Sequence, residues 1–283
     1  MKTLLSTRPL ANLETPLLAV VVAQGSAAPL KDASLERALA SGDYKGKKDE
    51  TLLVYGSGKT ERILLVGVGK PGEITRSSIR RASAIAAKRV RGLGTKSFAL
   101  AVSNEARGGL GAGELAQVVV EGAAQGGWQF TELKQQPEDP KPEIETLELV
   151  VDASDKAGAE AGRRIGDAIA AGYLFTRNLQ MQPGNVCTPS YLAEQARKLG
   201  ATHGFSVTIL DKAQIKKEGM GALLGVAQGS AEEPRFIVLE YQGGSGAPVA
   251  LMHPEKRSFT ASQNVTSETA IDRSIFRDLY LAL

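Results

Sequence analysis

Two glycine-rich segments contain the residue types that bind phosphate groups in other proteins. Gly67–Gly72 (GVGKPG) has the spacing of a dinucleotide-binding loop, and Gly56–Thr60 (GSGKT) ends like a phosphate-binding loop. The first pattern needs a helix that begins at its last glycine, but Pro71 and a delayed helix start at Thr75 interfere. The second pattern needs an earlier glycine where this chain has Leu53. We therefore predict that both segments are tight turns.

A basic helix face is the next candidate. The helix predicted to begin after Thr75 presents six cationic side chains without acidic partners: Arg76, Arg80, Arg81, Lys88, Arg89 and Arg91. Such a face could bind phosphates of a nucleic acid. No aromatic residues interleave with the cations to stack on bases. A solvated helix flank is the more common role, and nucleic acid remains the minority interpretation.

The single cysteine, Cys187, has two possible histidine partners, His203 and His253. A thiol nucleophile needs a base within hydrogen-bond reach, and nothing in the spacing implies one. One cysteine and two histidines also cannot supply a structural zinc site. We predict that Cys187 is a packed small residue.

The carboxylates in the second half of the chain have no metal-ligand spacing. They are expected to be surface charges on helices, loop edges or a strand end: Glu194, Glu218, Glu232, Glu233 and Glu240. The residue patterns therefore predict no catalytic, metal-binding or cofactor-binding residue in this chain.

The elements that would position such residues alternate between strand and helix in the first half. Apolar runs rich in Val and Leu predict strands, and amphipathic segments predict helices. Alternation of this kind implies an α/β fold with a mostly parallel sheet. The expected strands span 17–23, 52–55, 62–68, 97–102 and 146–151, and the expected helices span 33–40, 75–93 and 114–124.

The second half has clearer start and stop signals. After a proline-rich excursion at 134–145, Asp155 is expected to cap a helix through 157–171 towards Arg177. Thr188 and Pro189 open the next helix, and Asp211 caps a short one. Further strands are predicted at 205–210, 235–241 and 248–251.

Composition restricts the class of protein. The chain has 283 residues, 42% of them hydrophobic and 23% charged, which is typical of a globular protein long enough for two domains. The net charge of +3 is too small to favour nucleic acid or a membrane surface as a partner. No apolar run reaches the roughly 20 residues that a membrane span needs. A single cysteine fits a reducing compartment, so we expect a cytoplasmic location.

The segment from Arg177 to Tyr241 resembles a known family. RNLQMQPGNVCTPSYLAE and GMGALLGVAQGSAEEPRFIVLEY, with turns at 183–185 and 219–221, resemble the entry to the catalytic domain of the leucyl aminopeptidases. The resemblance extends weakly back to Leu17. It implies a macro-like N-terminal α/β domain, a hexamer, a cytosolic location and two divalent metals, manganese or zinc. It also implies peptide substrates that lose their N-terminal residue.

The family's metal ligands and catalytic groups lie in a Lys-Gly-Val-Thr-Phe-Asp segment and a later Asn-Thr-Asp-Ala-Glu-Gly-Arg segment. This chain instead continues from Leu251 with Met252, His253 and Pro254, and neither segment is present. We therefore expect a truncated member that binds no metal and is inactive, because a two-metal centre needs converging carboxylates.

The tail from Pro254 to Leu283 resembles haem-lyase membrane proteins of cytochrome c maturation. Within it, 267–283 is expected to form an amphipathic helix. A fusion or an assembly artefact would join two such pieces. The expected domains are 1–152, the macro-like domain; 153–251, a linker helix with the start of the peptidase domain; and 252–283, the unrelated tail.

Two other functions are weighed against this interpretation. The first is a non-catalytic module that binds a nucleotide or nucleic acid through its N-terminal domain. The second is a role of the tail in haem-protein assembly, which the lack of an expected membrane span disfavours. Strand edges beyond Arg177 are also expected to lack partners. Proteolysis should therefore remove that part of the chain and leave a resistant core near residues 1–150.

Overall fold

A computed structural model describes residues 1–135, 138–244 and 249–251. The chain divides into two compact units, with the division between Phe175 and Thr176. The mixed α/β class and the mainly parallel sheet predicted from the sequence are confirmed.

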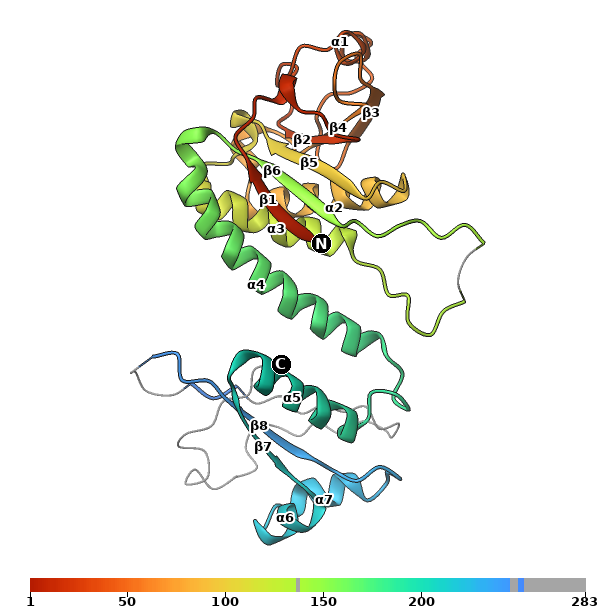
Figure 1. The fold of residues 1–283 in the computed structure, drawn as a ribbon, viewed down its shortest axis with the longest axis vertical. Coiled ribbons are helices and arrows are strands. Elements are labelled where there is room, and N and C mark those ends of the chain that lie inside the picture. The colour runs from red at the N-terminus through yellow and green to blue at the C-terminus, as the bar shows by residue number, and fades with distance from the viewer. Residues whose placement is uncertain (136–137, 245–248, 252–283) are drawn as a thin grey trace. The chain divides into compact units, whose positions relative to one another are not determined.

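The first unit is built on a six-stranded sheet with the order β1-β6-β5-β2-β4-β3 (Figure 1). All neighbouring strands run parallel except β3 and β4, which form an antiparallel pair. The strands are β1 Lys2–Ser6, β2 Leu18–Val22, β3 Thr51–Tyr55, β4 Arg62–Gly67, β5 Ser97–Val102 and β6 Thr146–Val150.

Four α-helices and four 3-10 turns belong wholly or mostly to this unit. They are α1 Ala33–Ala40, α2 Arg76–Gly92, α3 Ala112–Gly127 and α4 Lys156–Met181, with the turns Leu10–Asn12, Pro71–Glu73, Asn104–Ala106 and Ala153–Asp155. Residues of β2 alternate between two cores, as period-2 geometry requires. Leu18 and Val20 pack with Leu35 of α1, whereas Ala19 and Val21 pack against α2 and α3.

Helix α2 begins where the sequence predicts. The side chain of Thr75 accepts a hydrogen bond from the backbone N–H of Ser78, and the side chain of Ser78 accepts one from the backbone N–H of Thr75. This reciprocal pair satisfies two N–H groups that the first helical turn leaves open. The helix was expected to reach residue 93, but Leu93 is its C-cap residue and is 38% exposed.

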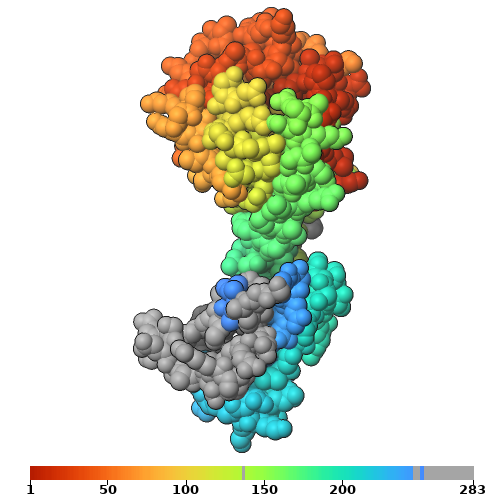
Figure 2. Space-filling model, turned by 90° about the vertical axis from the view of Figure 1, so that its left-hand side faces the viewer, coloured from red at the N-terminus to blue at the C-terminus, as the bar shows by residue number. Residues whose placement is uncertain are grey.

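Helices α2, α3 and α4 lie side by side, and glycines allow their close approach (Figure 2). A Cβ atom at Gly126 of α3 would lie 1.9 Å from the carbonyl oxygen of Ala84 of α2. One at Gly162 of α4 would lie 1.8 Å from the carbonyl oxygen of Gly113 of α3. Since Cβ contacts below 3.0 Å essentially do not occur, these positions exclude larger residues at the present spacing.

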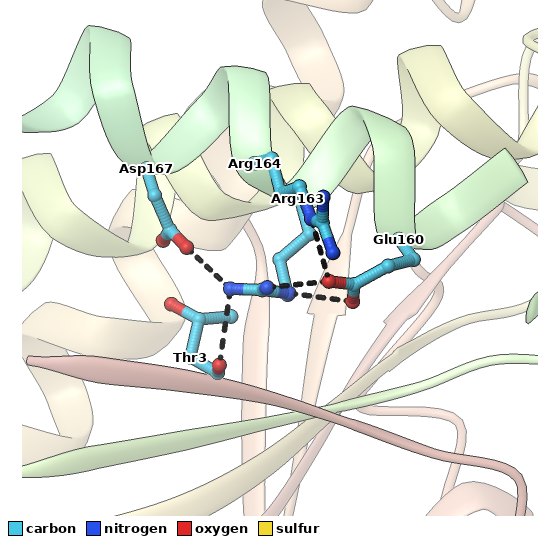
Figure 3. Close-up of polar contacts among 5 residues, drawn as sticks. All are labelled: Thr3, Glu160, Arg163, Arg164 and Asp167. Carbon is cyan, nitrogen blue, oxygen red and sulfur yellow. Dashed lines mark hydrogen bonds and ion pairs between the residues drawn. The ribbon is translucent and has the colours of Figure 1, made fainter. Parts of the chain in front are cut away.

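A salt-bridge cluster attaches α4 to the edge of the sheet (Figure 3). The guanidinium of Arg163 contacts Glu160 at 2.7 Å and Asp167 at 2.5 Å, and it donates to the carbonyl oxygen of Thr3 in β1 at 3.4 Å. Hydrogen bonds from Arg163 and then Arg164 lower the pKa of Glu160 to about 2. The cluster gives the edge strand β1 a partner outside the sheet.

The second unit contains a two-stranded antiparallel sheet and the helices around it. Its elements after α4 are α5 Pro189–His203, β7 Ser206–Leu210, α6 Lys212–Lys217, α7 Gly221–Ala227 and β8 Phe236–Glu240. Helix α5 packs against both strands. The predicted caps at Thr188 and Asp211 are both confirmed, and the side chain of Gln214 completes a capping box with Asp211.

Several sequence expectations differ from the structure. Strand β1 and helix α7 were not predicted, and α4 continues to Met181. Asp155, which was expected to cap this helix, lies immediately before its first residue. Its carboxylate accepts a hydrogen bond from the Arg107 side chain. The strand predicted at 248–251 is wrong for residues 249–251, which lie in no strand, and position 248 is outside the described residues. The amphipathic helix predicted at 267–283 lies outside the described residues as well.

Candidate functional site

The two glycine-rich segments are turns, as predicted. Gly69 has a φ of +89°, a left-handed conformation that suits glycine, and the chain then passes through the 71–73 turn before α2 begins. The first turn of α2 is capped by Thr75 and Ser78, so it does not present a row of open N–H groups beside Gly72.

The 56–60 segment joins the antiparallel strands β3 and β4. The backbone N–H of Gly56 donates to the carbonyl oxygen of Glu61 at 2.9 Å. The carboxylate of Asp32, which caps α1, accepts hydrogen bonds from the Ser57 N–H at 2.7 Å and from the Ser57 hydroxyl at 2.8 Å. Burial raises the pKa of Asp32, but the hydrogen bonds from Leu35 and Ser57 outweigh that effect and lower it overall. The segment therefore forms a turn that is fixed to α1.

The expectation that the basic face of α2 lacks acidic partners is wrong. Arg76 pairs with Glu114 at 3.1 Å, Arg80 with Glu121 at 2.7 Å and Arg81 with Asp49 at 2.7 Å. Arg89 and Arg91 donate to the Thr51 hydroxyl and the Trp128 carbonyl oxygen. The carboxylates come from α3 and from the loop before β3, and inspection of the helix sequence alone could not reveal them. Five of the six cations thus have protein partners.

Cys187 and His203 do not form a catalytic pair. Cys187 is buried next to the Thr188 cap of α5, and His203 is the last residue of the same helix. A helix of 15 residues at 1.5 Å per residue places them roughly 20 Å apart. The prediction of a packed small residue is confirmed for Cys187, and His253 lies outside the described residues.

The carboxylates of the second unit that the structure describes form no metal-binding group. Glu194 pairs with Arg197 at 3.4 Å on α5, and Glu233 pairs with Arg235 at 3.2 Å. Glu218 is the C-cap residue of α6, and Glu240 ends β8. In residues 1–135, 138–244 and 249–251, no group of three or more His, Cys, Asp or Glu side chains could hold a metal ion. The donors present in the described residues therefore do not fit a two-metal centre.

The structure shows a cavity that the sequence did not predict. It has a volume of about 590 Å³ and lies at the carboxyl end of β2, between the 24–28 loop, α1 and residues 44–46. The carboxyl edge of a parallel sheet is where α/β proteins commonly bind ligands. A small-residue loop after a central parallel strand (QGSAA at 24–28) is the signal that could have indicated it.

The walls of this cavity combine apolar and polar side chains. Val22, Leu39 and Leu65 provide apolar surface, and Glu36 and Lys45 provide one charge of each sign. Tyr44 also lines it, and burial, with the nearby Glu50 charge, raises the pKa of the Tyr44 phenol.

Comparisons with protein families identify two successive domains. Residues 23–137 match the N-terminal domain of the cytosol aminopeptidase family, and residues 174–252 match its catalytic domain. Residues 232–283 match the C-terminal β-sandwich of CcmF, so the predicted second resemblance is confirmed and begins before Pro254. Among the described residues, none of the helices has the length and apolar character to cross a membrane.

Curated relatives carry the same family name. The chain is 40% identical over 225 residues to a probable cytosol aminopeptidase of Syntrophotalea carbinolica, covering 77% of this chain and 45% of the relative. It is 37% identical over 249 residues to the cytosol aminopeptidase of Pseudomonas aeruginosa PAO1, covering 84% of this chain and 50% of the relative. The chain therefore spans about half the length of the curated relatives it matches.

Solved structures share the fold. A mutant tomato leucine aminopeptidase superposes with a TM-score of 0.72 at 22% identity, covering 88% of this chain and 52% of that one. The bottromycin maturation enzyme BotP, in complex with Mn, gives 0.65 at 22% identity, covering 81% and 45%. Two domain matches in the family's order, curated relatives at 37–40% identity and this shared fold lead to one conclusion: the chain belongs to the cytosol aminopeptidase family.

Proposed function

We propose that this chain carries the N-terminal domain and the entry to the catalytic domain of a metal-dependent aminopeptidase that releases N-terminal residues from peptides. The observation that carries the proposal is the order of the two family matches, 23–137 and then 174–252, within one polypeptide. The relatives' names supply the reaction class, aminopeptidase, and the Mn in the BotP structure supports divalent metals such as manganese or zinc as cofactors.

We further propose that the polypeptide with this sequence does not itself hydrolyse peptides or bind the metal pair. The sequence lacks the Lys-Gly-Val-Thr-Phe-Asp and Asn-Thr-Asp-Ala-Glu-Gly-Arg segments in which the resemblance places the ligands. Metal-assisted hydrolysis needs several oxygen and nitrogen donors that converge on the ions. What the described residues supply is a compact α/β unit and the first helices and strands of the unit that follows.

The test compares two proteins. One is this chain, and the other is a chimera in which residues after Leu251 are replaced by the corresponding segment of the Pseudomonas aeruginosa relative. With leucyl-p-nitroanilide and manganese, we expect turnover that a chelator abolishes for the chimera and none for the chain. Metal-dependent turnover by the unaltered chain would refute its inactivity. A folded chimera without turnover would contradict the proposed aminopeptidase role of these two domains.

Three further properties are proposals that accompany this function. The domain limits 1–152, 153–251 and 252–283 can be tested by limited proteolysis with mass spectrometry of the fragments. A hexamer and a cytoplasmic location are proposed from the family resemblance, and light scattering of the chimera tests the first. The ion pairs of the α2 arginines remove the observation that favoured a nucleic-acid-binding module, so that function is not proposed.

A further inference from the structure

The cavity at the carboxyl end of β2 has the size of a small-molecule site. Its volume of about 590 Å³ lies within the roughly 300–1,000 Å³ that is usual for ligand pockets. It lies in the first unit, on the face of the sheet that packs against α1. Its lining residues lie between Val22 and Leu65, so it belongs entirely to the first unit.

Two side chains of opposite charge line this cavity. Glu36 projects from the first turn of α1, and Lys45 follows α1 in the chain. Neither side chain takes part in a salt bridge within the described residues. An acid and a base that line one cavity without pairing with each other can bind the two ends of a zwitterion.

The remaining wall is largely aliphatic. Val22 and Leu65 come from neighbouring strands, and Leu39 comes from α1. Lys45 is the single cation among the described residues that line the cavity, and the Glu36 carboxylate repels anions. A phosphorylated ligand would therefore find little electrostatic support here. A ligand with an apolar body and balanced charge fits better.

We propose that this cavity binds a free aliphatic amino acid. Glu36 receives its ammonium group, Lys45 receives its carboxylate, and Val22, Leu39 and Leu65 contact its side chain. The chemical class is that of the product released by the proposed aminopeptidase, so the biological meaning rests on that function. A product site in the N-terminal unit would allow the product to regulate the enzyme from outside its catalytic centre.

Isothermal titration calorimetry on the full chain tests the proposal without any catalytic readout. The ligands are L-leucine, 4-methylpentanoate, which lacks the ammonium group, 3-methylbutylamine, which lacks the carboxylate, and glycine, which lacks the side chain. We expect L-leucine to bind and each of the three analogues to bind at least about tenfold more weakly, because each lacks one of the three groups that the site would contact: the ammonium, the carboxylate or the aliphatic side chain.

Variants locate the site. Glu36→Gln and Lys45→Gln are expected to weaken L-leucine binding about tenfold each by the same reasoning. The matched control Lys59→Gln removes a lysine at the β3–β4 turn and should leave binding unchanged. Glu36 and Lys45 are exposed, so neither substitution disturbs the core.

Three results would each overturn the proposal. The first is no heat of binding when L-leucine is titrated to tenfold molar excess over the protein at millimolar concentration. The others are 4-methylpentanoate binding as tightly as L-leucine, and both variants binding L-leucine as tightly as the wild type. These outcomes leave the chimera's hydrolysis untouched. Conversely, an inactive chimera with normal L-leucine binding would refute the aminopeptidase role and keep the site.

Discussion

Replacing Gly126 by alanine tests how strongly the close contact of α2 and α3 stabilises the first unit. The new Cβ atom would lie 1.9 Å from the Ala84 carbonyl oxygen, whereas contacts below 3.0 Å essentially do not occur. The two helices must therefore separate locally by at least about 1.1 Å, the difference between these distances. The obstructing atom belongs to the backbone of α2, so no side-chain rotation can relieve the collision.

The expected magnitude combines two opposing effects. Overpacking of this kind costs about 1–3 kcal/mol, and a gap of about 1 Å forfeits a quarter to a half of the dispersion energy at the contact. Alanine has a higher helix propensity than glycine by at most about 1 kcal/mol. We expect a net loss of about 2 kcal/mol. For a unit of this size that corresponds to a fall of roughly 4–8 °C in Tm.

A matched control separates packing from propensity. Gly172 lies within α4, and a Cβ atom there would meet nothing within 4 Å. Gly172→Ala is therefore expected to stabilise the protein by about 0.5–1 kcal/mol. Thermal unfolding followed by circular dichroism and urea titration would measure both variants. If Gly126→Ala proves as stable as Gly172→Ala, the inferred close contact of α2 and α3 does not exist.

Three other changes probe single contacts. Asp32→Ala should lower the free energy of unfolding by about 2 kcal/mol in urea titrations, because it removes the α1 cap and leaves Ser57 without its acceptor; an unchanged midpoint would contradict this. Glu160→Gln should lower the unfolding midpoint at pH 7. Because Arg163 lowers the pKa of Glu160 to about 2, the difference should persist above about pH 4.5 and shrink as the pH falls towards 2, and a difference that grows in acid would exclude this cause. The Cys187 thiol should resist alkylation until denaturant is added, and rapid labelling of the native protein would show that its burial is wrong.

Local signals in the sequence predict much of the fold. The Thr75 cap, the alternating apolar runs and the Thr188-Pro189 start are determined by neighbouring residues, and the structure confirms each of them. The conclusion that the glycine-rich segments are turns also needed only local information, since the N-cap signal for α2 lies at Thr75 and not at Gly72.

The parts that the sequence did not predict depend on distant residues. β1 is a five-residue strand, and its partner β6 lies near the other end of the first unit's sequence. The carboxylates that pair with the α2 arginines lie on α3 and in the loop before β3. The cavity combines a strand end, a helix face and a later loop, and no motif in the sequence connects Glu36 with Lys45. Tertiary packing creates these features, so local patterns cannot reveal them.

The pairing of β1 with β6 has a consequence for biosynthesis. Residues 2–6 leave the ribosome first, but their partner strand ends at Val150. At about 5–20 residues per second, the first strand must wait roughly 7–30 s before it can join the sheet. During that interval residues 2–6 have no partner strand and are available to chaperones.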